Sequence, residues 1–213
     1  MEIVRKKKPA KGQAEAEQHH NSHRRTVACL ELSTRHLYRR AFSEVSLLDS
    51  CGSFDFTDGH SYHFISAGDV DSLSYLKAML RAQDLDHCLL STWCMSAEDI
   101  LQLRKWVELG KIKKLDIYVG EIFPSSYRIE WQMLQDMYEN NGEKMGGGRV
   151  VFFRNHSKIY AGIGSKFAFG IETSANVNTN PRTEQGCITI SSEIYDFYKA
   201  YFDGISSFDY GKV

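Results

Sequence analysis

The sequence predicts an α/β protein with a mixed, mainly parallel sheet that is flanked by helices on both faces. From residue 60 onward, short apolar segments typical of strands alternate with longer segments whose apolar residues recur at helical spacing. Three such strand–helix units and a fourth strand favour right-handed crossovers between parallel strands. The 213 residues, 42% of them hydrophobic, suit one globular domain with an additional tail.

The first 25 residues differ in composition from the rest of the chain. They carry seven Lys and Arg against three Asp and Glu, a net charge of +4, and almost no large apolar residue. Such a segment buries too little surface to offset its loss of entropy, so we expect a disordered basic tail over residues 1–25. Of the 26 basic and 27 acidic residues in the chain, 19 and 24 then fall in residues 26–213, a net charge of −5. Residues 26–213 therefore do not form a broad basic surface for nucleic acid, and any phosphate must bind to a local group of basic and polar side chains.

Residues 26–58 form an N-terminal extension of the domain, and their pattern is the least regular in the chain. Residues 26–32 have the composition of a short strand. Apolar residues near helical spacing predict an amphipathic helix over residues 35–48, and the Gly-rich segment 52–59 predicts turns.

The regular part of the chain begins at residue 60. The expected strands lie at 61–67, 87–93, 115–123 and 149–153. The expected helices lie between them, at 69–83, 96–109 and 125–140. Each expected helix follows a residue that commonly caps a helix N-terminus: Asp69 or Asp71, Ser96, and Ser125 or Ser126.

After residue 155 the pattern changes. Two segments, 158–163 and 167–171, are joined by Gly164-Ser165 and predict a hairpin. A polar loop at 176–182, a strand at 186–191 and an aromatic-rich helix at 192–202 complete the chain.

Residues 155–184 carry the residue types that phosphoryl transfer needs. His156 and Lys158 are two residues apart, so on a strand they face the same side. The imidazole could attack phosphorus as a nucleophile, while Lys158 and Asn176 would hold the non-bridging oxygens of the phosphate. A carboxylate that is hydrogen-bonded to the second ring nitrogen would fix the tautomer of this imidazole. Glu184, the last residue of the stretch, supplies a carboxylate. Because His156 follows the fourth expected strand, it also lies where open α/β sheets bind ligands.

This order of residues resembles the phospholipase D superfamily, whose motif is H-x-K-x4-D with a downstream G-S-x-N. The match covers about thirty residues, and the order of elements extends it over about residues 60–205. The resemblance implies a phospholipase D-like fold and a phosphohistidine intermediate at His156, with a second His as general acid. It also implies that Lys158, Ser174 and Asn176 bind phosphate and that Glu184 orients His156.

The chain departs from the family motif at two positions. The motif's Asp falls at Ile163, and the Gly before S-x-N is Thr173. Glu172 is a nearby carboxylate that would substitute for the Asp. Arg154 and Arg182 would add further contacts to the phosphate, although each could equally be a charged side chain that faces solvent. An isolated H-x-K is common by chance, whereas its combination with S-x-N and Glu is far less common.

The chain holds one H-x-K motif, whereas the family's chemistry uses two across a pseudo-twofold axis. The resemblance therefore implies a homodimer whose partner copy supplies the second His. We expect a metal-independent phosphodiesterase without a cofactor, and first of all a nuclease, because single-motif dimers of the family resemble small endonucleases. The alternatives are a weak or inactive module that binds nucleic acid or phosphate, a lipid phosphodiesterase with an exposed apolar patch, and a scaffold.

Five cysteines without a C-x-x-C motif predict reduced thiols. No apolar run reaches the roughly 18–20 residues of a membrane span, and no apolar stretch follows the basic start as in a secretory signal. The sequence therefore predicts a cytoplasmic protein. His87, Cys88 and Cys94 lie close together, and we expect core cysteines with an exposed His87 rather than a metal site.

Overall fold

The structure is a computed structural model that describes residues 30–41, 43–66, 70–140, 147–178 and 182–207. The chain divides into two units, Met1–Glu31 and Leu32–Val213, and the named helices and strands lie in the second. The tail predicted at 1–25 lies outside the described residues, as does most of the strand predicted at 26–32. The described residues of that segment, 30–32, are not in a strand.

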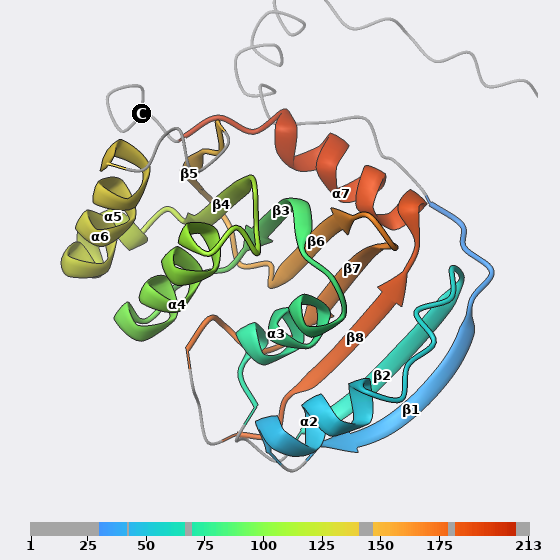
Figure 1. The fold of residues 1–213 in the computed structure, drawn as a ribbon. Helices are drawn as coiled ribbons and strands as arrows, with labels where there is room; N and C mark the ends of the chain where they lie inside the picture. Colours follow the sequence, from blue (N-terminus) through green and yellow to red (C-terminus); the bar gives the residue numbers. More distant parts are fainter. Residues whose placement is uncertain (1–29, 42, 67–69, 141–146, 179–181, 208–213) are drawn as a thin grey trace, which may run out of the picture. The chain divides into compact units, whose positions relative to one another are not determined.

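An eight-stranded sheet forms the centre of the second unit, in the order β1-β2-β8-β7-β6-β3-β4-β5 (Figure 1). Its strands are β1 (Arg35–Ala41), β2 (His60–Ser66), β3 (Leu85–Ser91), β4 (Leu115–Gly120), β5 (Val150–Phe153), β6 (Ile159–Gly164), β7 (Ala168–Thr173) and β8 (Gln185–Ile190). The pairs β1–β2, β3–β4 and β4–β5 are parallel, and the other four are antiparallel. Six of these strands therefore share one direction while β6 and β8 oppose it, which confirms a mixed, mainly parallel sheet.

Helices cover both faces of this sheet, as the sequence predicts. They are α2 (Glu44–Cys51), α3 (Ser72–Ala82), α4 (Ala97–Glu108), α5 (Phe123–Ser126), α6 (Arg128–Asn140) and α7 (Ser192–Asp203). A Cβ at Gly186 of β8 would lie 2.6 Å from the Tyr75 hydroxyl of α3, whereas one at Gly170 of β7 would lie 3.1 Å from Ile194 of α7. Gly170 pairs with Thr189 of β8, and directly paired residues face the same side of a sheet. Thr189 and Gly186 are three residues apart on β8, so they face opposite sides. The helices α3 and α7 therefore lie on opposite faces of the sheet. Among the described residues, no helix is long and apolar enough to cross a membrane.

The strand–helix pattern after residue 60 is confirmed, together with two of its caps. Asp71 is the N-cap of α3, where its side chain accepts from the Ser74 amide at 2.7 Å. Ser96 is the N-cap of α4, where it accepts from the Asp99 amide at 3.3 Å. The predicted hairpin is β6 and β7, which pair antiparallel.

The helix predicted over residues 35–48 is wrong. Residues Arg35–Ala41 form β1, which pairs in parallel with β2, and the helix α2 begins only at Glu44. Ser43 starts α2 with a capping box, since its hydroxyl accepts from the Ser46 amide at 3.3 Å. Hydrogen bonding to a neighbouring strand, which periodicity along the chain does not reveal, overrides the helical spacing of the apolar residues.

The cap predicted at Ser125 or Ser126 is also wrong. Both serines lie inside the short helix α5, which begins at Phe123 with Pro124 in its first turn. Proline suits the first turn of a helix because that position needs no amide donor. The long helix α6 then begins separately at Arg128.

His87 is buried rather than exposed, which corrects the sequence interpretation. The residue is 7% exposed in the structure. Its Nε2 lies 2.9 Å from Oδ2 of Asp116, and its Nδ1 lies 2.7 Å from the Tyr195 hydroxyl of α7. Both ring nitrogens therefore have buried polar partners. Cys88 and Cys94 are buried as expected.

Candidate functional site

His156 lies in the connection between β5 and β6, at the edge where the six co-directional strands end. Asn155, only 6% exposed, holds this connection in place. Its Nδ2 donates to the Ser91 hydroxyl (2.9 Å) and to the carbonyls of Thr92 (3.1 Å) and Tyr118 (3.2 Å). Its Oδ1 accepts from the amide (3.0 Å) and the hydroxyl (2.7 Å) of Ser157. One buried amide therefore ties the His156 backbone to the ends of β3 and β4.

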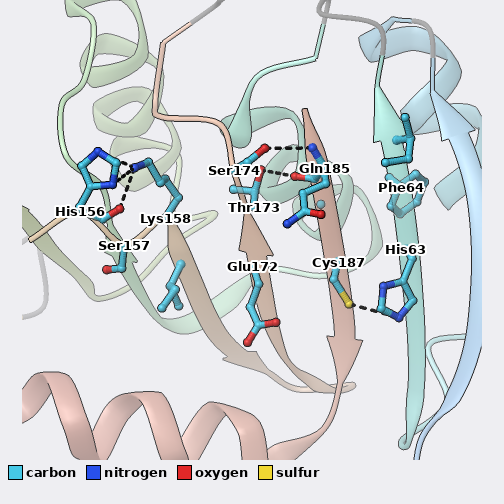
Figure 2. Close-up of a pocket in the computed structure, with 13 residues that line it drawn as sticks. His63, Phe64, His156, Ser157, Lys158, Glu172, Thr173, Ser174, Gln185 and Cys187 are labelled. Carbon is cyan, nitrogen blue, oxygen red and sulfur yellow. Dashed lines mark hydrogen bonds between the residues drawn. The ribbon is translucent and has the colours of Figure 1, made fainter. Parts of the chain in front are cut away.

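His156 and Lys158 are in direct contact, as their spacing predicts. The Lys158 Nζ lies 2.9 Å from Nδ1 of His156 and donates to the His156 carbonyl at 2.7 Å (Figure 2). The imidazole is exposed, and the Trp93 ring lies 5.7 Å from it, centroid to centroid. Partial burial lowers the pKa of Lys158, while the nearby Cys94 and Glu184 act against this shift. A partly desolvated ammonium gains strongly from an anionic ligand.

Glu184 is bound to Ser174. The Ser174 hydroxyl donates to Oε2 of Glu184 and accepts from the Gln185 amide at 3.0 Å. The Glu184 charge reaches Lys158, whose pKa it raises. No hydrogen bond joins Glu184 to His156 in the described ranges. His156 thus contacts Lys158, and Glu184 contacts Ser174, while only a charge interaction links Lys158 to Glu184. The implied contact between Glu184 and His156 is not made in this conformation.

Asn176 is held through its backbone. Its carbonyl accepts from the Ser72 hydroxyl at the start of α3 (2.8 Å), and the next amide, of Val177, donates to the Thr92 hydroxyl (3.3 Å). These bonds tie the loop after β7 to α3 and to the segment after β3. Oδ1 of Asn176 is buried without a hydrogen-bond partner in the described part of the chain. This oxygen is therefore not engaged by any of those residues.

An open cavity of about 1270 Å³ adjoins these residues. It extends across the ends of β6, β7, β8 and β2, from His156 and Lys158 at one end to His63 at the other (Figure 2). Ser174 is part of its lining, together with the apolar Ile65, which is 54% exposed. The cavity is large enough for a ligand that extends well beyond one phosphate.

Glu172 and the two arginines are the residues expected to assist the site. Glu172 lines the cavity and accepts a hydrogen bond from the Tyr198 hydroxyl of α7. It pairs with Ile159 at the start of β6, whereas Ile163 lies four residues further along that strand, roughly 13 Å away. Glu172 therefore does not stand beside the position of the motif's Asp. Arg154 and Arg182 are exposed.

No group of three or more His, Cys, Asp or Glu among the described residues could hold a metal ion. The polar side chains that line the cavity are instead two imidazoles, one ammonium, three hydroxyls, one amide, one thiol and one carboxylate. Such a set suits binding of a phosphate by hydrogen bonds and charge.

Sequence reasoning missed the role of Asn155, although the residue stands directly before His156. The available signal was an Asn immediately after a strand, where a side-chain amide commonly bonds nearby backbone groups. Its partners on β3 and β4 lie 37 to 64 residues away along the chain, so the sequence did not reveal that the amide is buried.

No family model and no curated protein matches this sequence. The fold is similar to phosphatidylserine synthase from Haemophilus influenzae Rd KW20, with a TM-score of 0.50 and 13% identity over 67% of this chain and 37% of that chain. It is also similar to polyphosphate kinase from Porphyromonas gingivalis, with a TM-score of 0.50 and 14% identity over 80% of this chain and 29% of that chain. The chain thus spans well under half the length of either protein, and at these identities the likeness shows the fold.

Proposed function

We propose that this chain, whose fold is that of the phospholipase D superfamily to which both similar structures belong, is a metal-independent phosphodiesterase. The observation that carries the proposal is an exposed imidazole with an ammonium 2.9 Å away, at one end of a large open cavity. A phosphate entering there would compete for the Lys158 ammonium and release Nδ1 of His156. The freed Nδ1 is where the carboxylate of Glu184 would bind during the reaction.

In the proposed reaction, a ring nitrogen of His156 attacks phosphorus. A P–N bond forms while the P–O bond to the leaving alcohol breaks, and a second imidazole gives its proton to the leaving oxygen. The same imidazole then takes a proton from the water that hydrolyses the phosphohistidine. Lys158, Ser174 and Asn176 bind the non-bridging oxygens and stabilise the charge that develops on them.

A second copy of the chain would supply the second imidazole in a homodimer. His63 also lines the cavity, but it lies three strands from β6, roughly 14 Å at the usual strand spacing. That separation is too large for both imidazoles of one chain to act on one phosphorus. The exposed Ile65 beside the cavity is an apolar surface that a partner copy would cover.

Nucleic acid is the first substrate class to test, because the single motif resembles that of small nucleases. A lipid phosphodiester is the second candidate. Ile65, Ile159 and Cys187 line the same cavity as Lys158, and an apolar surface that continues from the phosphate site is what a lipid substrate needs.

A binding module without turnover is the remaining alternative. Two observations favour it: Glu184 is bonded to Ser174 rather than to His156, and Ile163 replaces the motif's Asp. A module of this kind would still bind phosphate through Lys158 and the hydroxyl of Ser174.

The deciding experiment measures hydrolysis in EDTA by the full chain and by His156→Ala. The substrates are bis(p-nitrophenyl) phosphate, single- and double-stranded DNA, and phospholipid vesicles. We expect cleavage that EDTA leaves unchanged and that falls by roughly 10³-fold or more in the variant, because its nucleophile is lost. The thermal midpoint should stay unchanged, since His156 is exposed.

His60→Ala is the matched control, because His60 begins β2 and so lies at the opposite edge of the sheet. It should keep full activity. Retained turnover in His156→Ala would exclude the phosphohistidine, and a strict need for a divalent ion would exclude the metal-free scheme. Saturable phosphate binding without any cleavage would favour the binding module.

A further inference from the structure

Tyr75 buries a hydroxyl that has no hydrogen-bond partner among the described residues. The side chain lies on α3 and is 0% exposed, and its Oη is one of two such unpaired buried atoms in that part of the chain. A buried hydroxyl without a partner destabilises a folded protein, and phenylalanine would fill the same space without this loss. Packing alone therefore does not explain a tyrosine at this position.

Gly186 of β8 provides the room for this hydroxyl. A Cβ at residue 186 would lie 2.6 Å from Oη of Tyr75, which is closer than atoms pack. A glycine inside a strand weakens the strand and often marks the close approach of another group. Gly186 also lines the cavity that begins at His156. The Tyr75 hydroxyl therefore lies directly against the backbone of the candidate site.

Glu184 is placed on the same side of the sheet as this hydroxyl. Its carbonyl accepts from the Ser66 amide at 2.9 Å, which continues the pairing of β8 with β2 by one residue. Side chains two residues apart on a strand point the same way, so Glu184 and Gly186 both face α3. Burial raises the pKa of Tyr75, and the charge of Glu184 is among those that raise it further.

The other acceptors near Tyr75 are weaker or already in use. The charge of Asp71 raises the pKa of Tyr75 less than that of Glu184 does, and Oδ1 of Asp71 accepts from both the amide (2.7 Å) and the hydroxyl (3.0 Å) of Ser74. Burial raises the pKa of the Cys51 thiol to about 12, so it stays protonated, and a thiol sulfur accepts only weakly. Glu184 uses Oε2 for Ser174, and its Oε1 has no hydrogen bond to any described residue.

We propose that the Tyr75 hydroxyl is a positioning donor for the carboxylate of Glu184. It donates to Oε1 across one water while Oε2 is bonded to Ser174, and directly when Glu184 turns from Ser174 toward His156. The inference deepens the proposed function and rests on it, because the role of Glu184 in orienting His156 belongs to that function. Gly186 keeps the path between the hydroxyl and the carboxylate open.

The first test needs no catalysis. Urea midpoints at pH 7 are measured for the wild type, Tyr75→Phe, Glu184→Ala and the double variant. We expect Tyr75→Phe to lower the midpoint when Glu184 is present and to leave it unchanged or raise it when Glu184 is absent. Additive shifts, or a higher midpoint in both backgrounds, would overturn the proposal.

Tyr138→Phe is the matched control for this cycle. The Tyr138 hydroxyl donates at 2.7 Å to the carbonyl of Leu115 on β4, which is four strands from β8 in the strand order. Its loss should lower the midpoint by the same amount with and without Glu184. An unequal effect would mean that Glu184 couples to any tyrosine, and the specific link to Tyr75 would be lost.

The second test uses hydrolysis of bis(p-nitrophenyl) phosphate. Tyr75→Phe should lower kcat on the order of tenfold with KM unchanged, because a hydrogen bond to a charged group is lost. The acid limb of its pH–rate profile should move to higher pH, since that hydrogen bond favours the ionised carboxylate. An unmoved profile would overturn the positioning role. A wild type without turnover would contradict only the proposed phosphodiesterase, since the stability cycle still decides whether Tyr75 and Glu184 interact.

Discussion

At the scale of single residues, the position of His156 depends on a neighbour that does no chemistry. The Asn155 side chain makes five hydrogen bonds, all to groups at the same edge of the sheet. A side chain used in this way holds a short connection in one conformation without any regular secondary structure. Precise placement of the imidazole therefore rests on polar contacts rather than on apolar packing.

Asn155→Ala should destabilise the protein and impair the proposed hydrolysis. The change leaves buried donors and acceptors without partners, which costs roughly 1–3 kcal/mol in the free energy of unfolding. It also frees the connection that holds His156, so kcat should fall. Urea unfolding and kinetics on bis(p-nitrophenyl) phosphate measure both effects.

Gln132→Ala is the comparison variant, because the Gln132 side chain donates to Asp136 on the exposed side of α6. It should change stability by less than about 0.5 kcal/mol. Equal effects of the two variants would contradict the positioning role of Asn155.

At the scale of elements, the beginning of α4 carries an unusual carboxylate. Asp99 follows the N-cap Ser96 by three residues, and Oδ2 of Asp99 accepts from the Ser96 hydroxyl at 2.7 Å. Burial raises the pKa of Asp99 to about 6 from its ordinary 3.8, against the lowering effect of that hydrogen bond. The capping arrangement that the sequence predicts therefore holds a carboxyl group that resists ionisation.

This shift predicts how stability depends on pH. Between pH 3.8 and about 6 the folded protein holds a proton on Asp99 that the unfolded chain has lost. The contribution of Asp99 to stability is therefore full below pH 3.8 and falls as pH rises to about 6. From pH 4 to pH 7, the free energy of unfolding of the wild type should fall by about 1–3 kcal/mol relative to that of Asp99→Asn. Urea unfolding at the two pH values measures this difference.

Glu98→Gln is the control for this pH effect, because Glu98 is the exposed neighbour in the same turn. The free energy of unfolding of Glu98→Gln should differ from that of the wild type by nearly the same amount at both pH values. A pH-independent difference for Asp99→Asn would contradict the raised pKa.

The elements that sequence predicts best are those whose signals are local. The helix α3 shows its apolar residues at helical spacing after Asp71, and the structure buries Leu73, Leu76 and Met79 accordingly. The helical spacing in β1 is misleading because the stability of this strand comes from pairing with β2, each residue with a partner 25 positions later. Pairing partners at that distance leave no mark on the spacing of apolar residues.

At the scale of the whole molecule, the proposed homodimer gives the most direct prediction. Ile65 is 54% exposed at the open cavity, so a charge there should oppose the docking of a second copy. We expect light scattering after gel filtration to show a dimer for the wild type and a monomer for Ile65→Glu. The monomer should stay folded and lose hydrolysis, because each proposed site needs an imidazole from both copies.

Ile129→Glu is the matched control, since Ile129 is 73% exposed on α6 and does not line the cavity. It should remain dimeric and active. A wild type that is a monomer and still hydrolyses the substrate would contradict the shared site.

The sequence by itself determined the α/β class, the strands and helices from residue 60 onward, and the stretch that carries His156 and Lys158. Each of these follows from periodicity or spacing within a short segment, which local backbone geometry translates directly into structure. Only the tertiary structure decided the strand order, the bond between Glu184 and Ser174, and the hydroxyl of Tyr75 against Gly186. The bond from Ser72 to Asn176, for example, joins residues 104 positions apart. Such contacts depend on which strands and helices become neighbours, and hydrophobic burial of the whole chain selects that arrangement.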